Sequence, residues 1–259
     1  MSHYGFNVAT VSRLDGGAAG ALAYIFRGKF HDGYYDKTYD YTHIDDFLYS
    51  EVLVPDYAPP EYRDAVTLWK EMERAEKRYD ARIGRSVWLS LPNKLELDDW
   101  KKLVRDFANE AFVSLGMCVV AAIHFERNPD DPEKNNPNAH LFLSDRPLDR
   151  DGFCAKKDRD WNKKKHVRVW RKLWADVQNR VLEQKGLEKV SHESLEVQDK
   201  DREPTIPLGR VIMALEKRGI QTVCGDKNRE IEIRNREHIE RKQRPARERS
   251  RDRGRDRSR

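Results

Sequence analysis

The sequence predicts an α+β fold in which a central antiparallel sheet carries helices on its flanks. Short segments of alternating or continuous apolar residues recur along the 259-residue chain and have the length of strands. Longer segments with apolar residues at helical spacing lie between them. Two apolar segments, residues 118–126 and 138–144, are separated by a polar loop, which is the pattern of an antiparallel hairpin. Strands with helices between them indicate layered α+β packing.

The N-terminal part of the chain predicts one strand and two helices. Residues 6–12 (FNVATVS) alternate well enough for a strand, and residues 13–17 make a turn. The alanine-rich run 18–26 predicts a compact helix. Residues 31–60 are rich in Asp, Tyr and Pro and predict a long loop region with a short helix. The clearest amphipathic helix is predicted for residues 61–83, where apolar side chains recur on one face.

The middle of the chain predicts three strands and one helix. Pro92 ends the first of these strands, and Asp98 is the expected N-terminal cap of the helix. The expected bounds are 86–91 for the first strand, 98–115 for the helix, and 118–126 and 138–144 for the two strands of the hairpin.

The C-terminal part predicts two further helices and a basic tail. A long helix is expected over residues 164–186, which end in a glycine. A smaller unit follows, with a helix over residues 208–218 and a strand near Thr222. We expect residues 1–230 to form the main domain and residues 231–259 to form a disordered basic tail.

The positive charge of the chain is concentrated at its end. The formal net charge is +5, but residues 241–259 contribute +7, so residues 1–240 carry −2. The tail has no aliphatic or aromatic side chain larger than alanine and cannot help to build a core. Two interpretations are open, a solubilising appendage or a flexible segment that binds a polyanion.

The composition excludes several classes of protein. The longest uncharged apolar stretch, residues 18–26, is far shorter than a membrane span. The first residues, Met-Ser-His-Tyr, lack the basic and apolar regions of a signal peptide. The three cysteines are odd in number and lack metal-ligand spacing, which suits a reducing compartment. Secreted, transmembrane and disulfide-stapled proteins are therefore excluded, and we expect a cytoplasmic protein without membrane insertion.

A candidate metal site lies on the predicted hairpin. Side chains alternate along a strand, so His124 points to one face while Ile123 and Phe125 point to the other. His140 and Asn138 share a face of the returning strand, and pairing of the two strands would bring the imidazoles side by side. Two imidazoles and an amide oxygen can hold a divalent cation and leave positions open for a substrate. The alternative is that these are ordinary hydrogen-bonded polar residues.

A candidate nucleophile precedes two basic residues. Tyr24 lies in the last turn of the predicted helix and is followed by Arg27 and Lys29. This arrangement suits a phenolate formed beside a phosphate. A metal would polarise a phosphoryl oxygen, and the tyrosine oxygen would replace a sugar oxygen to give a covalent phosphotyrosine. Since the chain has ten tyrosines, Tyr24 taken alone could equally be an interior aromatic residue.

Four stretches, in order along the chain, resemble the MobA/MobL family of conjugative relaxases, the mobilisation nickases of the HUH class. The first two are SRLDGGAAGALAYIFRGKF and LWKEMERAEKRYDARIGRSVWLSLP. The third, AAIHFERNPDDPEKNNPNAHLFLSDRPL, is similar to the metal motif of the family. The fourth is WRKLWADVQNRVLEQKGLEKVSHESLEVQDKDREPTIPLG, followed by EKRGIQT. The resemblance implies that residues 1–230 form a relaxase domain with an HUH-type fold.

The resemblance also implies roles for individual residues. Tyr24 matches the nucleophilic tyrosine of the family, and His124 and His140 match the outer metal ligands. The family motif NPHxH reads NPNAH here, so Asn138 stands in place of the middle ligand. An amide oxygen is a harder ligand than an imidazole, which favours Mg²⁺ or Mn²⁺.

The function implied by the resemblance is that of a metal-dependent DNA nickase and strand transferase. Its substrate would be single-stranded DNA at the origin of transfer of a plasmid or mobile element, and it would remain joined to the 5′ phosphate. Relaxosome accessory proteins and a coupling protein would be its partners. Two alternatives stay open. One is a DNA-binding accessory protein that kept the fold and lost catalysis, which Asn138 favours, and the other is an HUH replication initiator.

DNA binding by a slightly acidic body requires that positive charge be gathered locally. We expect a basic groove that passes Tyr24 and the histidine pair. The principal candidates for DNA contacts are Arg13, Arg27 and Lys29, and the further candidates are Lys156, Lys157 and residues 163–165.

Overall fold

The computed structural model describes residues 4–129, 131–132, 135–199 and 201–243. The chain divides into a larger unit that ends at His192 and a smaller unit that starts at Glu193. All the site residues expected from the sequence belong to the larger unit.

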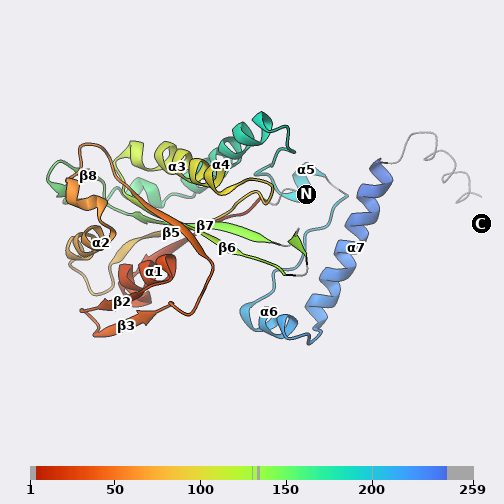
Figure 1. Cartoon of the computed structure of the whole chain (residues 1–259), viewed down its shortest axis with the longest axis horizontal. Helices are drawn as coiled ribbons and strands as arrows, with labels where there is room; N and C mark the ends of the chain where they lie inside the picture. The colour runs from red at the N-terminus through yellow and green to blue at the C-terminus, as the bar shows by residue number, and fades with distance from the viewer. Residues whose placement is uncertain (1–3, 130, 133–134, 200, 244–259) are drawn as a thin grey trace, which may run out of the picture. The chain divides into compact units, whose positions relative to one another are not determined.

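The larger unit is built on a five-stranded antiparallel sheet with the strand order β1-β5-β7-β6-β4 (Figure 1). The two strands of the predicted hairpin, β6 and β7, lie inside this sheet, and each has a neighbour on both sides. The predicted fold class, a central antiparallel sheet with flanking helices, is confirmed. The strands are β1 (Phe6–Ser12), β4 (Phe47–Leu53), β5 (Arg82–Ser90), β6 (Val119–Glu126) and β7 (Asn136–Ser144).

Helices cover both faces of the sheet (Figure 1). Helices α3 (Leu97–Ala111) and α4 (Lys164–Gln184) pack on one face, and α1 (Gly17–Phe26) and α2 (Ala65–Arg74) pack on the other. Further 3-10 helices are η1 (Arg13–Asp15), η2 (Pro60–Arg63), η3 (Val113–Leu115) and η5 (Arg159–Asn162). Two small hairpins pair β2 (Lys29–Asp32) with β3 (Lys37–Asp40), and β8 (Leu148–Asp149) with β9 (Gly152–Phe153).

Strand β6 shows why the sheet carries helices on both faces. Val119, Ala121 and Ile123 join the core beneath α3 and α4, whereas Val120 and Ala122 join the core beneath α1 and α2. Alternation of side chains along the strand therefore places apolar surface on both faces. Full burial of an aliphatic side chain such as Ile123 stabilises the fold by about 1.5–3 kcal/mol, so both faces must be covered.

The prediction of a long loop over residues 31–60 is wrong, because this segment contains the second half of β2 and all of β3 and β4. Strand β4 lies at the edge of the main sheet, and none of its side chains is fully buried. The β2–β3 hairpin is largely polar and half-exposed. The β2–β3 hairpin therefore lacks the apolar pattern of a strand, and the apolar residues of β4 (FLYSEVL) do not alternate regularly with polar ones.

Helix α2 is shorter than the helix predicted for residues 61–83, and β5 begins four residues earlier than expected. Arg13 accounts for this end of the helix. Its guanidinium donates hydrogen bonds of 2.9–3.0 Å to the carbonyl oxygens of Glu73, Glu76 and Arg78. Carbonyls at a helix C-terminus lack intrahelical partners, so a buried arginine from elsewhere in the chain lets the chain turn into β5.

The start of α3 also differs from the prediction. Glu96 rather than Asp98 is the N-cap, and it forms a reciprocal capping box with Asp99. Asp98 lies in the first turn of the helix, where its negative charge complements the helix dipole.

The smaller unit contains α5 (Leu195–Gln198), α6 (Arg210–Lys217) and α7 (Val223–Gln243). The strand expected near Thr222 is absent among its described residues, because Thr222 precedes α7 and accepts a 3.1 Å hydrogen bond from the backbone N–H of Gly225. This is the geometry of a helix N-cap. Residues 231–243 of the expected tail continue α7, and residues 244–259 lie outside the described residues. No helix in the described parts of the chain is long and apolar enough to cross a bilayer.

Candidate active site

Helix α1 carries Tyr24 in its last turn. The neighbouring side chains Leu22 and Ile25 are buried against the sheet, whereas Tyr24 is 37% exposed. The helix ends at Arg27, which adopts a left-handed conformation with φ 50°. The apolar face of the helix thus fixes its position and leaves the Tyr24 ring accessible beside the sheet.

Strands β6 and β7 bring the predicted histidines and asparagine together next to this ring. His124 pairs with Asn138 across the two strands, and Ala122 pairs with His140. Cross-strand partners share a face, so all three polar side chains lie on the face that carries α1. The ring centroids of His124 and His140 are 4.8 Å apart. The Tyr24 ring lies 5.1 Å from that of His140 and 6.3 Å from that of His124.

Two buried atoms of this group lack hydrogen-bond partners among the described residues. The Nε2 atom of His124 lies 2.7 Å from the carbonyl oxygen of Ile25, which can only accept, so Nε2 carries the proton. The Nδ1 atom therefore holds a free lone pair and has no partner. The Oδ1 atom of Asn138 is also unpaired, although its amide group donates to the carbonyl of Asn136 at 3.0 Å. Each unpaired buried polar atom costs about 1–3 kcal/mol.

Burial keeps both imidazoles neutral at physiological pH. Removal from water, together with the nearby His124 and Arg27, lowers the pKa of His140 to about 3. Burial likewise lowers the pKa of His124. Neutral imidazoles offer lone pairs, so the group can coordinate a cation without first losing protons.

Asp46 is a site residue that sequence reasoning missed. The guanidinium of Arg27 lies 4.2 Å from the centroid of the Tyr24 ring and donates two hydrogen bonds to Asp46, of 2.7 and 2.9 Å. This guanidinium holds the pKa of Asp46 below its usual range. The backbone carbonyl of Asp46 accepts a 2.7 Å bond from the N–H of Phe125, which places it beside β6. The sequence offered only a weak signal, the acidic pair Asp45-Asp46 in an expected loop.

Aromatic side chains surround the exposed edge of Tyr24. The Tyr41 ring meets that of Tyr24 edge-on at 5.4 Å, and the His43 ring stacks on Tyr41 at 6.5 Å. Phe47, at the start of β4, is 39% exposed and lies 6.3 Å from the His124 ring. These rings form a partly exposed aromatic surface beside Tyr24.

The structure gives the three principal DNA-contact candidates different positions. Arg27 lies at the site. Lys29 is 64% exposed and pairs with Asp40 at 3.3 Å on the β2–β3 hairpin. Arg13 is buried, and besides the α2 carbonyls it binds the carboxylate of Glu73 at 3.1 Å. Its donors are engaged inside the protein, so the structure gives Arg13 a structural role.

The further lysine candidates do not join these residues in one groove within the described part of the chain. Lys163 and Lys165 pair with Asp160 at the start of α4, on the opposite face of the sheet. Lys156 and Lys157 line a separate pocket near the start of β5. The expected single basic groove past Tyr24 is therefore not what the structure shows.

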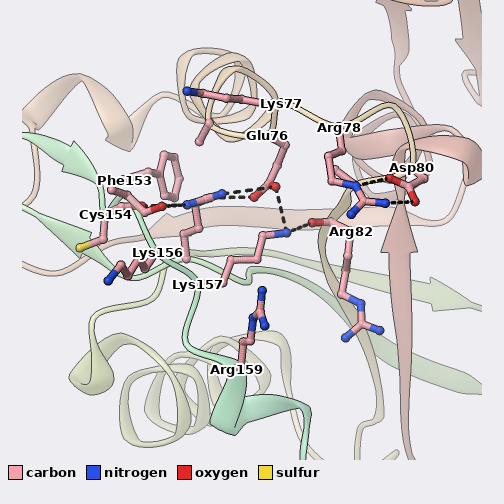
Figure 2. Close-up of a pocket in the computed structure, with 14 residues that line it drawn as sticks. Glu76, Lys77, Arg78, Asp80, Arg82, Phe153, Cys154, Lys156, Lys157 and Arg159 are labelled. Atoms are coloured by element: carbon pink, nitrogen blue, oxygen red, sulfur yellow. Dashed lines mark hydrogen bonds and ion pairs between the residues drawn. The ribbon is translucent and has the colours of Figure 1, made fainter.

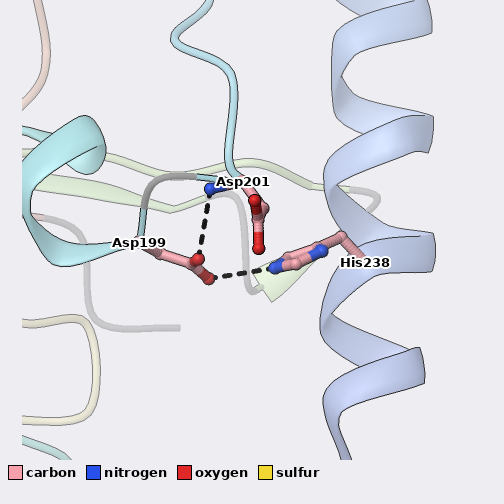
Figure 3. A group of neighbouring side chains, drawn as sticks. All are labelled: Asp199, Asp201 and His238. Carbon is pink, nitrogen blue, oxygen red and sulfur yellow. Dashed lines mark hydrogen bonds and ion pairs between the residues drawn. The ribbon is translucent and has the colours of Figure 1, made fainter.

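A second group of possible metal ligands lies in the smaller unit (Figure 3). Asp199, Asp201 and His238 have their ligand atoms within 4.8 Å of one another. Asp199, however, already accepts hydrogen bonds from His238 at 3.2 Å and from Lys242 at 2.7 Å. Asp199 is thus already paired with the cationic Lys242 and with His238, and these contacts hold α7 to the preceding loop.

Comparison with known proteins agrees with this arrangement. The profile of the MobA/MobL family matches residues 17–218. The "Probable mobilization protein MobA" of Bifidobacterium longum (strain NCC 2705) is 27% identical over 274 residues, which cover 89% of this chain and 47% of that protein. "Mobilization protein A" of Escherichia coli is 28% identical, over 93% of this chain and 34% of that protein. The chain thus spans about half the length, or less, of these relatives.

A solved structure gives the same result at the level of the fold. The chain described under "Molecular Basis of Vancomycin Resistance Transfer in Staphylococcus aureus" is 30% identical in sequence, with a TM-score of 0.65. The match covers 74% of this chain and 100% of that chain. The profile match extends over most of the sequence and includes Tyr24 and the His124–His140 hairpin. The chain belongs to the MobA/MobL family.

Proposed function

We propose that this chain is the DNA-nicking domain of a mobilisation relaxase, with Tyr24 as its nucleophile. The proposal depends on one observation, the partly exposed Tyr24 ring beside His124 and His140, with Asn138 on the same face of the sheet. The substrate is single-stranded DNA at the origin of transfer of a plasmid or mobile element. Such a reaction takes place in the cytoplasm, with relaxosome accessory proteins and a coupling protein as partners.

The proposed step is a transesterification at one phosphodiester. The Oη atom of Tyr24 loses its proton to solvent and forms a bond to phosphorus, while the bond from phosphorus to the 3′ oxygen breaks. The 3′ oxygen takes up a proton and leaves as a hydroxyl. The 5′ end of the DNA stays on Tyr24 as a phosphotyrosine, and attack by a 3′ hydroxyl reverses the step and rejoins the strand.

Arg27 supports this step electrostatically. Its guanidinium lies against the face of the Tyr24 ring, where negative charge develops as the phenol proton leaves. The two hydrogen bonds to Asp46 hold the guanidinium in place, so it is positioned before the DNA binds. Preorganised charge of this kind is a large contribution to catalysis at phosphates.

The donor set fits a small divalent cation, Mg²⁺ or Mn²⁺. The unpaired Nδ1 of His124 and Oδ1 of Asn138, with the neutral ring of His140, would hold it. A bound cation would polarise the scissile phosphate and offset the charge of the transition state. Coordination would also remove the cost of the two unpaired buried atoms, which is why they support the assignment.

Tyr41, His43 and Phe47 give the site a way to hold unpaired bases. Stacking of a base on an aromatic side chain contributes about 1–3 kcal/mol and requires single-stranded DNA. Their position beside Tyr24 favours a single strand over a duplex at the point of cleavage.

One observation favours a second function. Asn138 stands where the family motif has a histidine, and a weaker ligand set is consistent with a protein that binds the origin DNA without cutting it. Both functions require DNA binding that weakens with salt. Nicking alone requires a covalent adduct.

The test is adduct formation with a labelled single-stranded oligonucleotide from the cognate origin, in Mg²⁺ or Mn²⁺. Wild-type protein should give a labelled band that survives denaturation and disappears after protease treatment. Tyr24→Phe should abolish it. Tyr57→Phe is the matched control, because it removes the same hydroxyl from an exposed tyrosine between β4 and η2, outside the site, and should leave the adduct unchanged. Binding without any adduct in the wild type would refute the nickase and support the accessory function.

A further inference from the structure

We propose that a basic pocket at the far end of the central strands is a second binding site for DNA phosphates, separate from the Tyr24 site. The inference rests on the proposed function, since it assumes that DNA is the substrate. The pocket has a volume of about 1110 Å³ (Figure 2). Its walls come from the segment between α2 and the start of β5, from Arg146, and from the segment that begins at Phe153 in β9.

The wall of the pocket is strongly positive. Seven of its fourteen lining residues are basic and two are acidic, which gives a net charge of +5. Both acidic groups are already paired. Asp80 accepts two hydrogen bonds of 2.8 Å from Arg78, and Glu76 accepts bonds from Arg146 at 2.8 Å and from Lys157 at 2.9 Å. These pairs appear as dashed lines in Figure 2.

Three cations of the pocket have no internal partner. Lys77, Lys156 and Arg159 are exposed and make no ion pair or hydrogen bond with any described residue. Figure 2 shows Arg159 directed toward Lys157 across the pocket. Residues 1–240 carry a net charge of −2, so a charge of +5 in one pocket wall is a local concentration of positive charge. Arg82 is partly balanced by Asp145, 4.0 Å away, and the three free cations are available to an external anion. Like charges held this close repel one another unless an anion lies between them.

The floor of the pocket is fixed in advance. Glu76 is 8% exposed and lies between Arg146 and Lys157. The Arg146 guanidinium also donates to the carbonyls of Cys154 and Ala155, at 3.1 and 2.6 Å. Side chains held in this way lose little conformational freedom when a ligand binds. The three free cations therefore lie around a floor that Glu76, Arg146 and Lys157 hold rigid.

The chemistry of the wall favours a nucleic-acid backbone over a small ligand. Pockets for small molecules are lined mainly by apolar side chains with a few polar groups, whereas half of this lining is basic. Lys and Arg contacts to phosphates dominate DNA affinity and need no sequence information. The pocket therefore suits positioning of the DNA rather than reading of its sequence.

The pocket is within reach of DNA bound at Tyr24. Arg82, in the pocket wall, precedes Trp88 by six residues on β5, and Trp88 pairs with His140. Six residues span about 20 Å along a strand. At about 3.4 Å per nucleotide for a single strand that keeps the base stacking of a duplex, this is roughly six nucleotides. The pocket would thus contact DNA about six nucleotides from the cleaved phosphate.

The closing experiment compares salt dependence in two variants of the full chain. Lys77→Gln/Lys156→Gln/Arg159→Gln removes the three free cations of the pocket. Arg168→Gln/Lys172→Gln/Lys189→Gln is the matched control, because it removes the same charge from exposed positions on and just after α4. The logarithm of the binding constant for the origin oligonucleotide is measured against the logarithm of salt concentration.

The pocket variant should lower the steepness of this plot by about two, since each single-strand phosphate contact contributes about 0.7, while the control leaves it unchanged. With an oligonucleotide truncated to about four nucleotides on each side of the nick, shorter than the proposed reach, the two variants should behave alike. An unchanged slope in the pocket variant, or an equal fall in the control, would overturn the proposal and leave an acidic protein segment as the better occupant.

The covalent adduct separates this test from that of the proposed function. An adduct with an unaffected salt slope means that the pocket proposal fails and the nickase stands. A reduced slope without an adduct means that the pocket binds DNA and the nickase fails. Absence of any DNA binding by wild-type protein overturns both.

Discussion

Arg27 and Asp46 form a two-point ion pair directly beside the Tyr24 ring. Their side chains are 7% and 18% exposed, and the two hydrogen bonds measure 2.7 and 2.9 Å. The pair joins the end of α1 to the segment that leads into β4 and thereby positions the guanidinium against the ring. Asp46 is a positioning residue, because it acts on Tyr24 through Arg27.

Asp46→Ala should destabilise the protein and slow adduct formation. It leaves the Arg27 charge largely buried without a partner, which should cost about 2–3 kcal/mol, somewhat less than for a fully buried pair. Urea unfolding measures the stability, and a time course of the adduct measures the rate. The control is Asp56→Ala, which removes an exposed pair with Arg63 at 3.9 Å and should change stability by less than about 1 kcal/mol. Equal losses in both variants would contradict the role of the pair.

The metal-free protein should lose stability as the pH falls below about 6.5. The His140 pKa is about 3 in the folded state because of burial, whereas an unfolded histidine titrates near 6.5. Between these values the unfolded chain binds a proton that the folded chain does not. Stability is therefore complete above about pH 6.5 and falls by about 1.4 kcal/mol per pH unit toward pH 3.

Urea unfolding in EDTA at several pH values measures this slope. His140→Gln should lower the slope by that amount, and the exposed His43→Gln should leave it as in the wild type. A His140→Gln slope equal to that of the wild type would show that the ring is not buried as described.

Asn138 should decide the affinity and selectivity for metal. Asn138→Ala removes the unpaired Oδ1 atom and should weaken Mn²⁺ binding at least about tenfold, which is about 1.4 kcal/mol. Asn138→His adds an imidazole and should shift preference toward softer ions such as Ni²⁺ or Zn²⁺. Isothermal titration calorimetry measures both. Mn²⁺ binding that is unchanged in Asn138→Ala would exclude this residue as a ligand.

Arg13→Ala should affect stability rather than DNA binding. It leaves the Oε2 atom of Glu73 and the carbonyls of Glu73, Glu76 and Arg78 without this donor, which should cost about 3–5 kcal/mol. The salt dependence of DNA binding should stay as in the wild type. Arg13→Lys keeps the charge but cannot reach several carbonyls at once, so it should recover only part of the stability. A reduced salt slope with normal stability would instead support the DNA contact expected from the sequence.

The sequence was most informative where local alternation decides the structure. The placement of His124, Asn138 and His140 on one face follows from the period of two in a strand and from the hairpin between them. The position of Tyr24 relative to them could not be derived in this way, because it depends on how α1 packs against the sheet. The family resemblance, rather than periodicity, singled out this tyrosine.

The missed features depend on contacts between distant segments. Asp46 is a site residue because the guanidinium of Arg27, nineteen residues earlier, donates to it, and within residues 41–48 only the acidic pair Asp45-Asp46 hints at this. The end of α2 depends on Arg13, which lies about sixty residues earlier in the chain. The apolar residues of β4 (FLYSEVL) come in two groups rather than in alternation, so they do not mark a half-buried strand. Side-chain contacts between distant segments are invisible to local patterns.

The hydrogen bond from His124 to the carbonyl of Ile25 has a consequence for how the site can be dissected. It fixes the tautomer of the ring and, at the same time, fastens the nucleophile's helix to a central strand, one residue from Tyr24. Any replacement of His124 therefore weakens the attachment of α1 to the sheet and also removes a proposed metal ligand. The two effects cannot be separated in one variant. His140 has no such hydrogen bond to α1 among the described residues. A substitution of His140 therefore tests metal binding without disturbing the position of Tyr24.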